Sequence, residues 1–255
     1  MLKLGLQLYT VREEMEQDFE GTLKKVAELG YQGVEFHTFF GRSSAEVKRL
    51  LDENGLVALG THTQYTSLLN DLDSEITYNK EIGNNKIIVP YLGTEQRNWA
   101  EVFTNLKQIG EKCREQGIVL LYHNHEFEFT ESFDDQTVFD AMYAEVPASL
   151  LQVELDTCWV HFAGYDPVEY IHKYAGRLPI VHWKDMKKLE DGSPLTVELG
   201  QGEVNLGAIA EAADKAGVEW IVVEQDLCQN PPLESIASSM EWVKNYKNNG
   251  GPIHV

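Results

Sequence analysis

Residues 118–125 read Ile-Val-Leu-Leu-Tyr-His-Asn-His, a run of five apolar or aromatic residues followed by two histidines around an asparagine. A strand that is apolar at nearly every position is buried on both faces, as in parallel sheets covered by helices. The 255-residue chain contains seven more runs of this kind: Lys3–Leu8, Gly33–Phe36, Val57–Thr61, Lys86–Val89, Leu150–Leu155, Pro179–His182 and Trp220–Val223. The eight runs predict eight buried parallel strands.

Amphipathic patterns lie between these runs, with apolar residues recurring at every third and fourth position, which is typical of helices. They include Gly21–Leu29, Ser44–Asn54, Asn98–Gln116 and Pro231–Tyr246, and glycines that stop helices stand at Gly30, Gly55, Gly117 and Gly217. Eight strand-helix units of about 32 residues predict an α/β fold, a closed (β/α)₈ TIM barrel that forms a single domain over residues 1–255. The alternative, an open doubly wound sheet, normally has a glycine-rich phosphate loop after its first strand, where this chain reads Gln7-Leu8-Tyr9-Thr10. Residues 248–252 are expected to form a loose terminus.

The charge balance restricts the partners of the protein. Asp and Glu outnumber Lys and Arg by 41 to 21, which gives a formal net charge of −20. Such a surface repels nucleic acids and anionic membranes, so neither is an expected partner. The first residues lack the pattern of a signal peptide, and a cytoplasmic protein is expected. Three scattered cysteines without CxxC spacing argue against a disulfide framework and a thiolate zinc site.

Polar residues follow the predicted strands at the end where a barrel carries its active site. They are Gln7, Glu35, His37, His62, Tyr91, His123, His125, Asp156, His182, Lys184, Asp185, Glu224, Gln225 and Asp226. Five of the eight histidines of the chain are among them. Imidazoles and carboxylates that meet on one rim are typical of a metal site. Taken alone, Glu35 or His62 could equally cap a helix or satisfy a loop.

Five short motifs occur in the order in which a known family has them: Gly33-Val34-Glu35, Leu155-Asp156-Thr157, His182-Trp183-Lys184-Asp185, Gly200-Gln201-Gly202-Glu203-Val204 and Val223-Glu224-Gln225-Asp226. With them the chain resembles the xylose-isomerase-like TIM barrels, which include sugar phosphate isomerases and epimerases and the apurinic-site endonucleases. Within this family it is most similar to the inosose dehydratase-like branch. The resemblance implies a small sugar or cyclitol as substrate.

The resemblance also implies one divalent metal ion, Mn²⁺ first, with Zn²⁺, Co²⁺ or Mg²⁺ as alternatives. Its implied ligands at the sixth, seventh and eighth strands are Asp156, His182 and Glu224. At the fifth strand the family has a glutamate, and this chain has His123 there. Epimerases of the family use two metal-bound glutamates as bases on opposite faces of the substrate, so this departure favours isomerisation or dehydration through an enolate that the metal stabilises.

The expected roles of the other site residues follow from this chemistry. Glu224 is the expected base, and His125 or Glu126 is a substitute base. Lys184 and His62 are expected proton donors, although Lys184 could simply pair with Asp185. The expected substrate contacts are Glu35, Asp185 and the aromatic rings of Trp159 and Trp183. Two alternatives remain open, namely a non-catalytic sugar-binding barrel and an enzyme similar to the apurinic-site endonucleases. A monomer and a homodimer are both compatible with the sequence.

Overall fold

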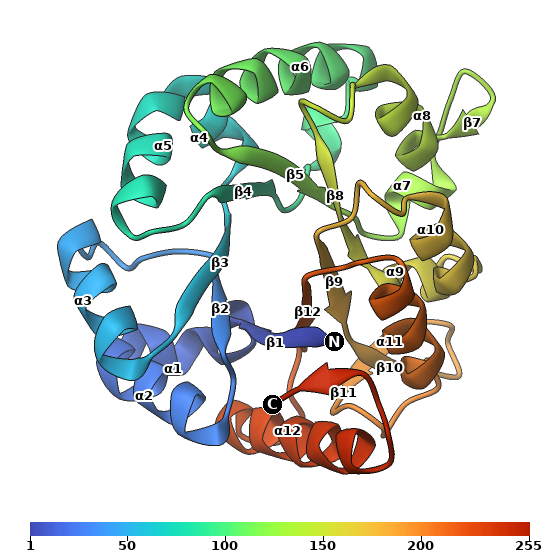
Figure 1. The fold of residues 1–255 in the computed structure, drawn as a ribbon. Helices are drawn as coiled ribbons and strands as arrows, with labels where there is room; N and C mark the ends of the chain where they lie inside the picture. The colour runs from blue at the N-terminus through green and yellow to red at the C-terminus, as the bar shows by residue number, and fades with distance from the viewer.

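Eight parallel strands close into a barrel in the computed structural model, which describes residues 1–255 (Figure 1). Each strand pairs with the next one along the chain, and the last pairs with the first, so the sheet has no open edge within the ring. The barrel strands are β1 (Leu2–Gln7), β2 (Gly33–Phe36), β3 (Val57–His62), β4 (Lys86–Val89), β5 (Val119–His123), β8 (Gln152–Asp156), β9 (Ile180–Trp183) and β12 (Trp220–Val223). All eight predicted strands and the predicted TIM barrel are confirmed.

Helices surround the barrel on the outside (Figure 1). They are α1 (Arg12–Gln17), α2 (Phe19–Leu29), α3 (Ser44–Asn54), α4 (Tyr65–Asn70), α5 (Leu72–Glu81), α6 (Trp99–Glu115), α7 (Phe127–Thr130), α8 (Val138–Glu145), α9 (Thr157–Phe162), α10 (Pro167–Lys173), α11 (Leu206–Lys215) and α12 (Pro232–Asn248), with 3₁₀ turns η1 (Leu8–Val11) and η2 (Thr94–Gln96). Gly30 and Gly55 end α2 and α3 with φ of 112° and 64°, a left-handed conformation that costs glycine little. None of the helices has the length and apolar composition that a membrane span requires.

The barrel interior is apolar at one end and polar at the other. A separate cluster of six buried side chains fills the apolar end: Leu59, Ile88, Leu121, Ile180, Trp220 and Val222. Gly33 makes room for it, because a Cβ there would lie 2.9 Å from atoms of Leu59 and Trp220. Successive residues of a strand point to opposite faces, so the residue two positions after each inward-facing one also points inward. This alternation directs His123, His182 and Glu224 into the barrel, two residues after Leu121, Ile180 and Val222.

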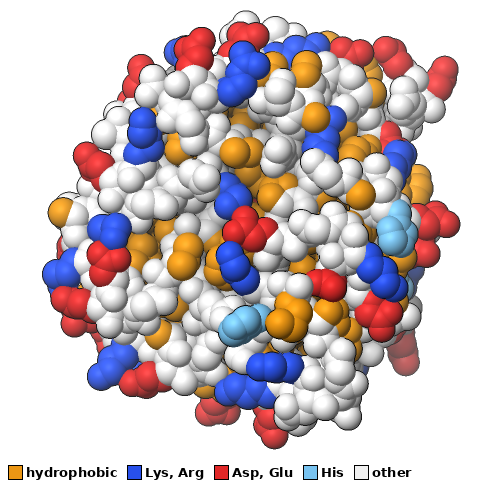
Figure 2. All heavy atoms as spheres, viewed as in Figure 1, with side chains coloured by type: hydrophobic (Ala, Val, Ile, Leu, Met, Phe, Trp, Pro, Cys, Tyr) orange, Lys and Arg blue, Asp and Glu red, His pale blue; other side chains and the backbone are white.

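Short elements complete the fold. The hairpin of β10 (Asp185–Lys188) and β11 (Pro194–Val197) follows β9, and a smaller hairpin of β6 (Ser132–Phe133) and β7 (Gln136–Thr137) follows α7. Acidic and basic side chains are interspersed on the face seen in Figure 2.

The expectation of a loose terminus at residues 248–252 is wrong. The α12 helix runs to Asn248, and Pro252 accepts a hydrogen bond from the backbone N–H of Leu2 at 2.8 Å. The following strand β13 (Ile253–His254) pairs in parallel with β1. Ile253 is buried in the main hydrophobic core, and this burial fixes the segment in place.

Candidate active site

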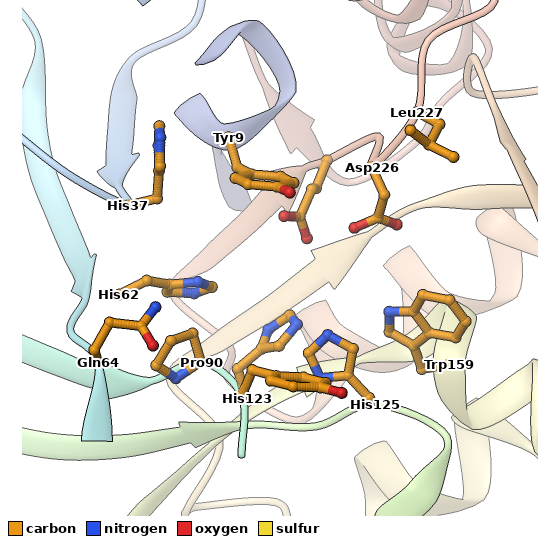
Figure 3. A pocket seen from close by; sticks show the side chains of 12 residues that line it. Tyr9, His37, His62, Gln64, Pro90, His123, His125, Trp159, Asp226 and Leu227 are labelled. Carbon is orange, nitrogen blue, oxygen red and sulfur yellow. The ribbon is translucent and has the colours of Figure 1, made fainter. Parts of the chain in front are cut away.

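A cavity of about 440 Å³ opens at the carboxyl ends of the barrel strands. Its lining combines histidines and carboxylates with aromatic and apolar side chains: Tyr9, His37, His62, Gln64, Pro90, Tyr91, His123, His125, Trp159, Glu224, Asp226 and Leu227. In Figure 3, Tyr9, Asp226 and Leu227 lie across the cavity from His123 and His125. Tyr9, Tyr91 and Leu227 are also among the most exposed large hydrophobic residues of the chain. The cavity therefore has a polar floor and a partly apolar rim.

Four polar side chains lie close together at the floor of the cavity and just below it. The inward-facing His123, Asp156, His182 and Glu224 each offer one ligand-type atom, and these atoms lie within 4.8 Å of one another. All four residues are buried. Nδ1 of His182 lies 2.8 Å from Oε2 of Glu224, and Nε2 of His123 lies 3.8 Å from Oδ2 of Asp156. The structure thus brings together the four residues expected to be ligands.

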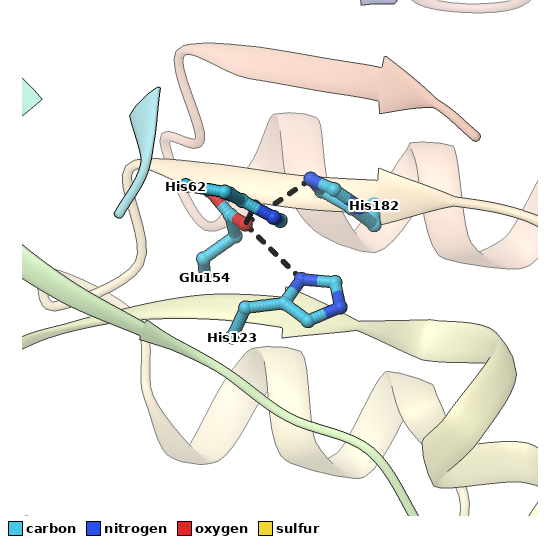
Figure 4. A group of neighbouring side chains, drawn as sticks. All are labelled: His62, His123, Glu154 and His182. Carbon is cyan, nitrogen blue, oxygen red and sulfur yellow. Dashed lines mark hydrogen bonds and ion pairs between the residues drawn. The ribbon is translucent and has the colours of Figure 1, made fainter. Parts of the chain in front are cut away.

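The other nitrogen of each histidine faces a second group of side chains, deeper in the barrel. Oε1 of Glu154 lies 3.1 Å from Nδ1 of His123, 3.2 Å from Nε2 of His182 and 2.7 Å from Nε2 of His62 (Figure 4). A carboxylate on the far nitrogen of a ligating imidazole fixes its tautomer and orientation. Glu154 therefore leaves Nε2 of His123 and Nδ1 of His182 directed toward Asp156 and Glu224.

Glu154 is the functional candidate that the sequence reasoning missed. It stands inside the run Leu150–Leu155, which the sequence pattern predicts to be a mostly apolar strand. A usable signal was present, since Gln152, Glu154 and Asp156 alternate along β8 and therefore share one face. If Asp156 points inward, Glu154 must do so too.

Glu35 and His62 form part of this deeper group. Oε1 of Glu35 lies 2.7 Å from Nε2 of His62 and 3.1 Å from Nε2 of His182, and Glu35 also accepts a hydrogen bond from Gln7. Burial alone would lower the pKa of His62, but the charges of Glu35 and Glu154 raise it to about 10. Glu35 is fully buried and absent from the cavity lining, so the expected substrate contact is not seen. His62 does reach the cavity.

Lys184 lies behind the cavity wall and does not line it. Its Nζ atom lies 2.9 Å from Oδ2 of Asp156, 3.0 Å from Oε2 of Glu224 and 2.9 Å from Oδ2 of Asp226. Burial would lower the pKa of Lys184, but these carboxylates raise it well above its usual value. Lys184 is therefore a fixed cation that orients Glu224 and Asp226, and the alternative pairing with Asp185 is not found.

Trp183 and Asp185 do not contact the cavity, contrary to the expectation that they bind substrate. Trp183 alternates with the inward-facing His182, so it points outward, where its Nε1–H donates to the carbonyl of Leu206 and its ring packs against Trp242. The Asp185 carboxylate instead accepts four backbone hydrogen bonds from the residues that follow it. Trp159, the other aromatic candidate, does line the cavity.

The donor set fits a divalent cation. Oε2 of Glu35 and Oε2 of Glu154 are buried and accept no hydrogen bond, and Oδ2 of Asp156 has Lys184 as its close partner at 2.9 Å. Five carboxylates converge around the floor, and their cationic partners are Lys184, His62 and His182. Buried carboxylates that outnumber their cationic partners destabilise the folded protein. A divalent ion bound by carboxylate oxygens and imidazole nitrogens would balance the excess negative charge.

The model of the xylose isomerase-like TIM barrel family matches residues 23–246. The chain is 22% identical to an inosose dehydratase of Clostridium beijerinckii, with 90% of each protein covered. It is similar in fold to a sugar phosphate isomerase/epimerase from Parabacteroides distasonis, with a TM-score of 0.80 and 21% identity over 95% of this chain and 93% of that one. The structure of the IolI protein with a bound zinc atom gives a TM-score of 0.74 and 18% identity over 97% of this chain and 99% of that one. The family match covers most of the barrel, and the chain belongs to the xylose isomerase-like TIM barrel family.

Proposed function

We propose that this protein is a divalent-metal-dependent enzyme that removes a proton next to the carbonyl group of a keto sugar or an oxo-inositol, as an isomerase, epimerase or dehydratase. The observation that carries the proposal is the buried set of His123, Asp156, His182 and Glu224 at the floor of the cavity. The inosose dehydratase name of one relative and the zinc atom of one structural neighbour support the substrate class and the metal.

The four residues of the set would hold the ion, with Mn²⁺ as the first candidate. When bound, the ion would polarise the substrate carbonyl and offset the negative charge that develops on its oxygen. Glu224 reaches the cavity and is the proposed base. Nζ of Lys184 lies 3.0 Å from Oε2 of Glu224, and this contact fixes the orientation of the Glu224 carboxylate.

Two histidines of the lining are proposed to act on the oxygen that shifts or departs, His62 as the proton donor and His125 as a neutral hydrogen-bonding group. His62 touches the cavity and is held by Glu35 and Glu154, which favour its protonated form. Burial lowers the pKa of His125 to about 3, so its ring is neutral at pH 7. Nδ1 of His125 is buried without a partner and is free to bond a substrate hydroxyl. With His123 in place of a second carboxylate base, the arrangement favours isomerisation or dehydration over epimerisation by two bases.

The proposal is tested by proton exchange. The purified protein is incubated with keto sugars and oxo-inositols in D₂O, with Mn²⁺ or after treatment with a chelator, and deuterium and product structure are followed by NMR. We expect metal-dependent deuterium incorporation with a carbonyl shift or loss of water. Inversion of one carbon alone would identify an epimerase, and no exchange with any substrate would favour a non-catalytic sugar-binding barrel.

A pair of variants tests whether Glu224 is the base. Glu224→Gln keeps the shape of the side chain but removes the base, so exchange should fall by about 10² or more. Glu198→Gln is the matched control, because Glu198 is a buried carboxylate that bonds Asn230 and Ser235 outside the cavity. Exchange at the wild-type rate in Glu224→Gln would remove Glu224 from this role.

A further inference from the structure

We propose that His37 and Gln64 form a second hydrogen-bonding region of the cavity, which binds a substrate hydroxyl group remote from the reacting carbon and so determines which substrates are accepted. This inference rests on the proposed function and adds two residues to it, neither of which is a proposed metal ligand, base or proton donor. Four observations carry it: the position of the two side chains, the unpartnered imidazole of His37, the strained loop that holds this ring, and the free amide of Gln64.

The two residues lie at the same end of the cavity. The neighbouring strands β2 and β3 pair in parallel up to the residues just before His37 and His62, so these two histidines leave the strands side by side. His37, His62 and Gln64 all line the cavity. Figure 3 shows these three side chains at one end of the cavity and Trp159 at the other, with His123 between them. A substrate that binds over the floor at His123 can therefore extend toward both ends.

The imidazole of His37 has hydrogen-bonding capacity that the protein does not use. Its Nδ1 atom is buried and has no hydrogen-bond partner, whereas the histidines of the floor, His62, His123 and His182, each lie close to a carboxylate. Burial and the positive charges of His62 and Arg12 lower the pKa of His37 to about 4. The ring is therefore neutral at pH 7, with one donor and one acceptor nitrogen. A buried polar atom without a partner destabilises the folded protein, and a substrate hydroxyl group would supply the missing partner.

Packing alone does not account for a histidine at this position. The His37 ring packs edge-on against Tyr9 and Phe40, with ring centroids 5.3 and 5.7 Å apart. A phenyl ring would make the same two contacts without an unpartnered nitrogen. The contacts also fix the ring, because the Arg12 guanidinium lies over Tyr9 at 4.3 Å from the ring centroid. The imidazole is therefore held in one orientation before a substrate binds, which lowers the entropy cost of binding.

The loop that carries His37 is strained. Phe40 has a φ of 51°, in the left-handed region that bulky side chains rarely adopt. Backbone strain of this kind collects at binding and catalytic sites, where the surrounding structure maintains it. The ring of Phe40 maintains it here, because it packs against both Phe19 and His37. The strained turn thus serves to place His37 at the cavity.

Gln64 has an amide group that the adjacent helix does not use. The residue directly precedes α4, but its side chain does not cap the N-terminus of the helix. The side chain is exposed and lines the cavity. An amide offers both donors and an acceptor, as does the neutral imidazole of His37. The two groups together suit a hydroxyl group, which donates one hydrogen bond and accepts others.

The first test removes the hydrogen-bonding atoms of His37. Deuterium exchange with Mn²⁺ in D₂O is measured on D-fructose, on 2-keto-myo-inositol, and on analogues that lack one hydroxyl group away from the carbonyl, such as 6-deoxy-D-fructose. His37→Phe keeps the ring contacts but loses both nitrogens, so KM for the parent compounds should rise roughly 10-fold while kcat stays within about 2-fold. Wild type should prefer a parent compound over a deoxy analogue by a similar factor, and His37→Phe should lose this preference.

Two further variants separate substrate binding from a purely structural role of His37. His37→Asn keeps a hydrogen-bonding group near the position of Nδ1 and should restore part of the preference for the parent compound. His172→Phe is the control, because His172 is exposed in the last turn of α10 and does not line the cavity. Wild-type KM together with a wild-type preference in His37→Phe would overturn the inference for His37.

Gln64→Leu tests the second residue and is not expected to disturb folding, because the side chain is exposed. We expect KM to rise roughly 3-fold, as for the loss of one partly solvated hydrogen bond. Gln116→Leu is the control, since Gln116 is an exposed glutamine at the end of α6 outside the cavity lining. An unchanged KM in Gln64→Leu would overturn the inference for Gln64, and this variant remains decisive if His37→Phe does not fold.

Calorimetry of the same compounds on the Mn²⁺-loaded proteins separates this inference from the proposed function. If wild type binds the compounds but exchanges no deuterium, the proposed function fails. The affinities of His37→Phe and Gln64→Leu relative to wild type then still decide the inference, with weaker binding supporting it and equal binding overturning it. If wild type exchanges deuterium and both variants match it, only the inference fails. No binding of any compound to wild type would overturn both.

Discussion

His123 occupies the position where the family resemblance leads one to expect a glutamate, so the site has one carboxylate fewer among its proposed ligands. Glu154 lies directly beneath and contacts His123 and His182 through one oxygen, Oε1. A carboxylate is thus present one layer deeper than the expected fifth-strand glutamate, where it does not line the cavity. It acts instead through the two imidazoles that it orients.

Replacing Glu154 tests this role. Glu154→Gln keeps the volume but loses the charge that aligns two histidines, and we expect the affinity for Mn²⁺ to fall by roughly 10- to 100-fold. Equilibrium dialysis of the metal measures the effect independently of turnover. Glu198→Gln controls for loss of a buried carboxylate elsewhere and should bind Mn²⁺ like wild type. Unchanged affinity in Glu154→Gln would show that Glu154 only fills space.

A complementary change restores the glutamate of the family. His123→Glu supplies a carboxylate ligand, and we expect the variant to retain metal but lose native turnover, because the charge around the ion and its Lewis acidity change. Metal content and deuterium exchange report the two properties separately. A variant with wild-type turnover would show that the identity of residue 123 does not decide the reaction.

The sequence predicted which candidate residues lie at the ends of strands, and it misplaced those whose position depends on side-chain direction. Asp156 and Glu224 each follow an apolar run, and this marks them as residues of the barrel rim. Trp183 was assigned to the cavity because it neighbours His182, yet alternation along β9 sends it outward. Asp185 was misplaced because its partners lie 15 to 19 residues ahead, and no local pattern reports such contacts.

At the scale of elements, the short helix α7 anchors the loop that carries His125. Glu128 of α7 is fully buried and bonds the Tyr122 hydroxyl at 2.6 Å and the His125 backbone N–H at 2.8 Å. Burial raises the pKa of Glu128 to about 8, and its two hydrogen bonds offset only part of this effect. The carboxyl group is therefore protonated in the folded protein at neutral pH.

This protonation predicts a pH-dependent stability. Between pH 4.5, the ordinary pKa of the group, and pH 8, the folded protein holds a proton that the unfolded chain has released. The contribution of Glu128 to stability is thus complete below this range and declines as the pH rises through it. Glu128→Gln mimics the protonated form, so its free energy of unfolding should exceed that of wild type increasingly up to pH 8, by at most about 1.4 kcal/mol per pH unit. Urea denaturation at several pH values measures this difference, and a constant difference between the two proteins would contradict the assignment.

The fold itself was predictable at the scale of the whole molecule because eight continuous apolar runs permit few other arrangements. The C-terminal segment was not, since Asn248, Asn249 and two glycines precede the single strand pair that holds it. The closed barrel also concentrates negative charge at one place, beneath the cavity. A bound divalent ion should therefore stabilise the whole fold.

This stabilisation is measurable in solution. A ligand that binds only the folded state stabilises it by about 2.7 kcal/mol at 100 times its Kd, so Mn²⁺ should raise the melting temperature of wild type. Asp156→Ala removes a proposed ligand and should abolish the increase. A melting temperature of Asp156→Ala that rises with Mn²⁺ as in wild type would place the ion elsewhere.

The decisive measurement is the position of the ion in a crystal of the Mn²⁺-loaded protein, because anomalous scattering identifies the metal by element. We expect one peak per chain, bounded by Nε2 of His123, Nδ1 of His182 and the carboxylates of Asp156 and Glu224. A peak in the deeper group of His62, Glu154 and Glu35, or no peak in the barrel, would contradict it.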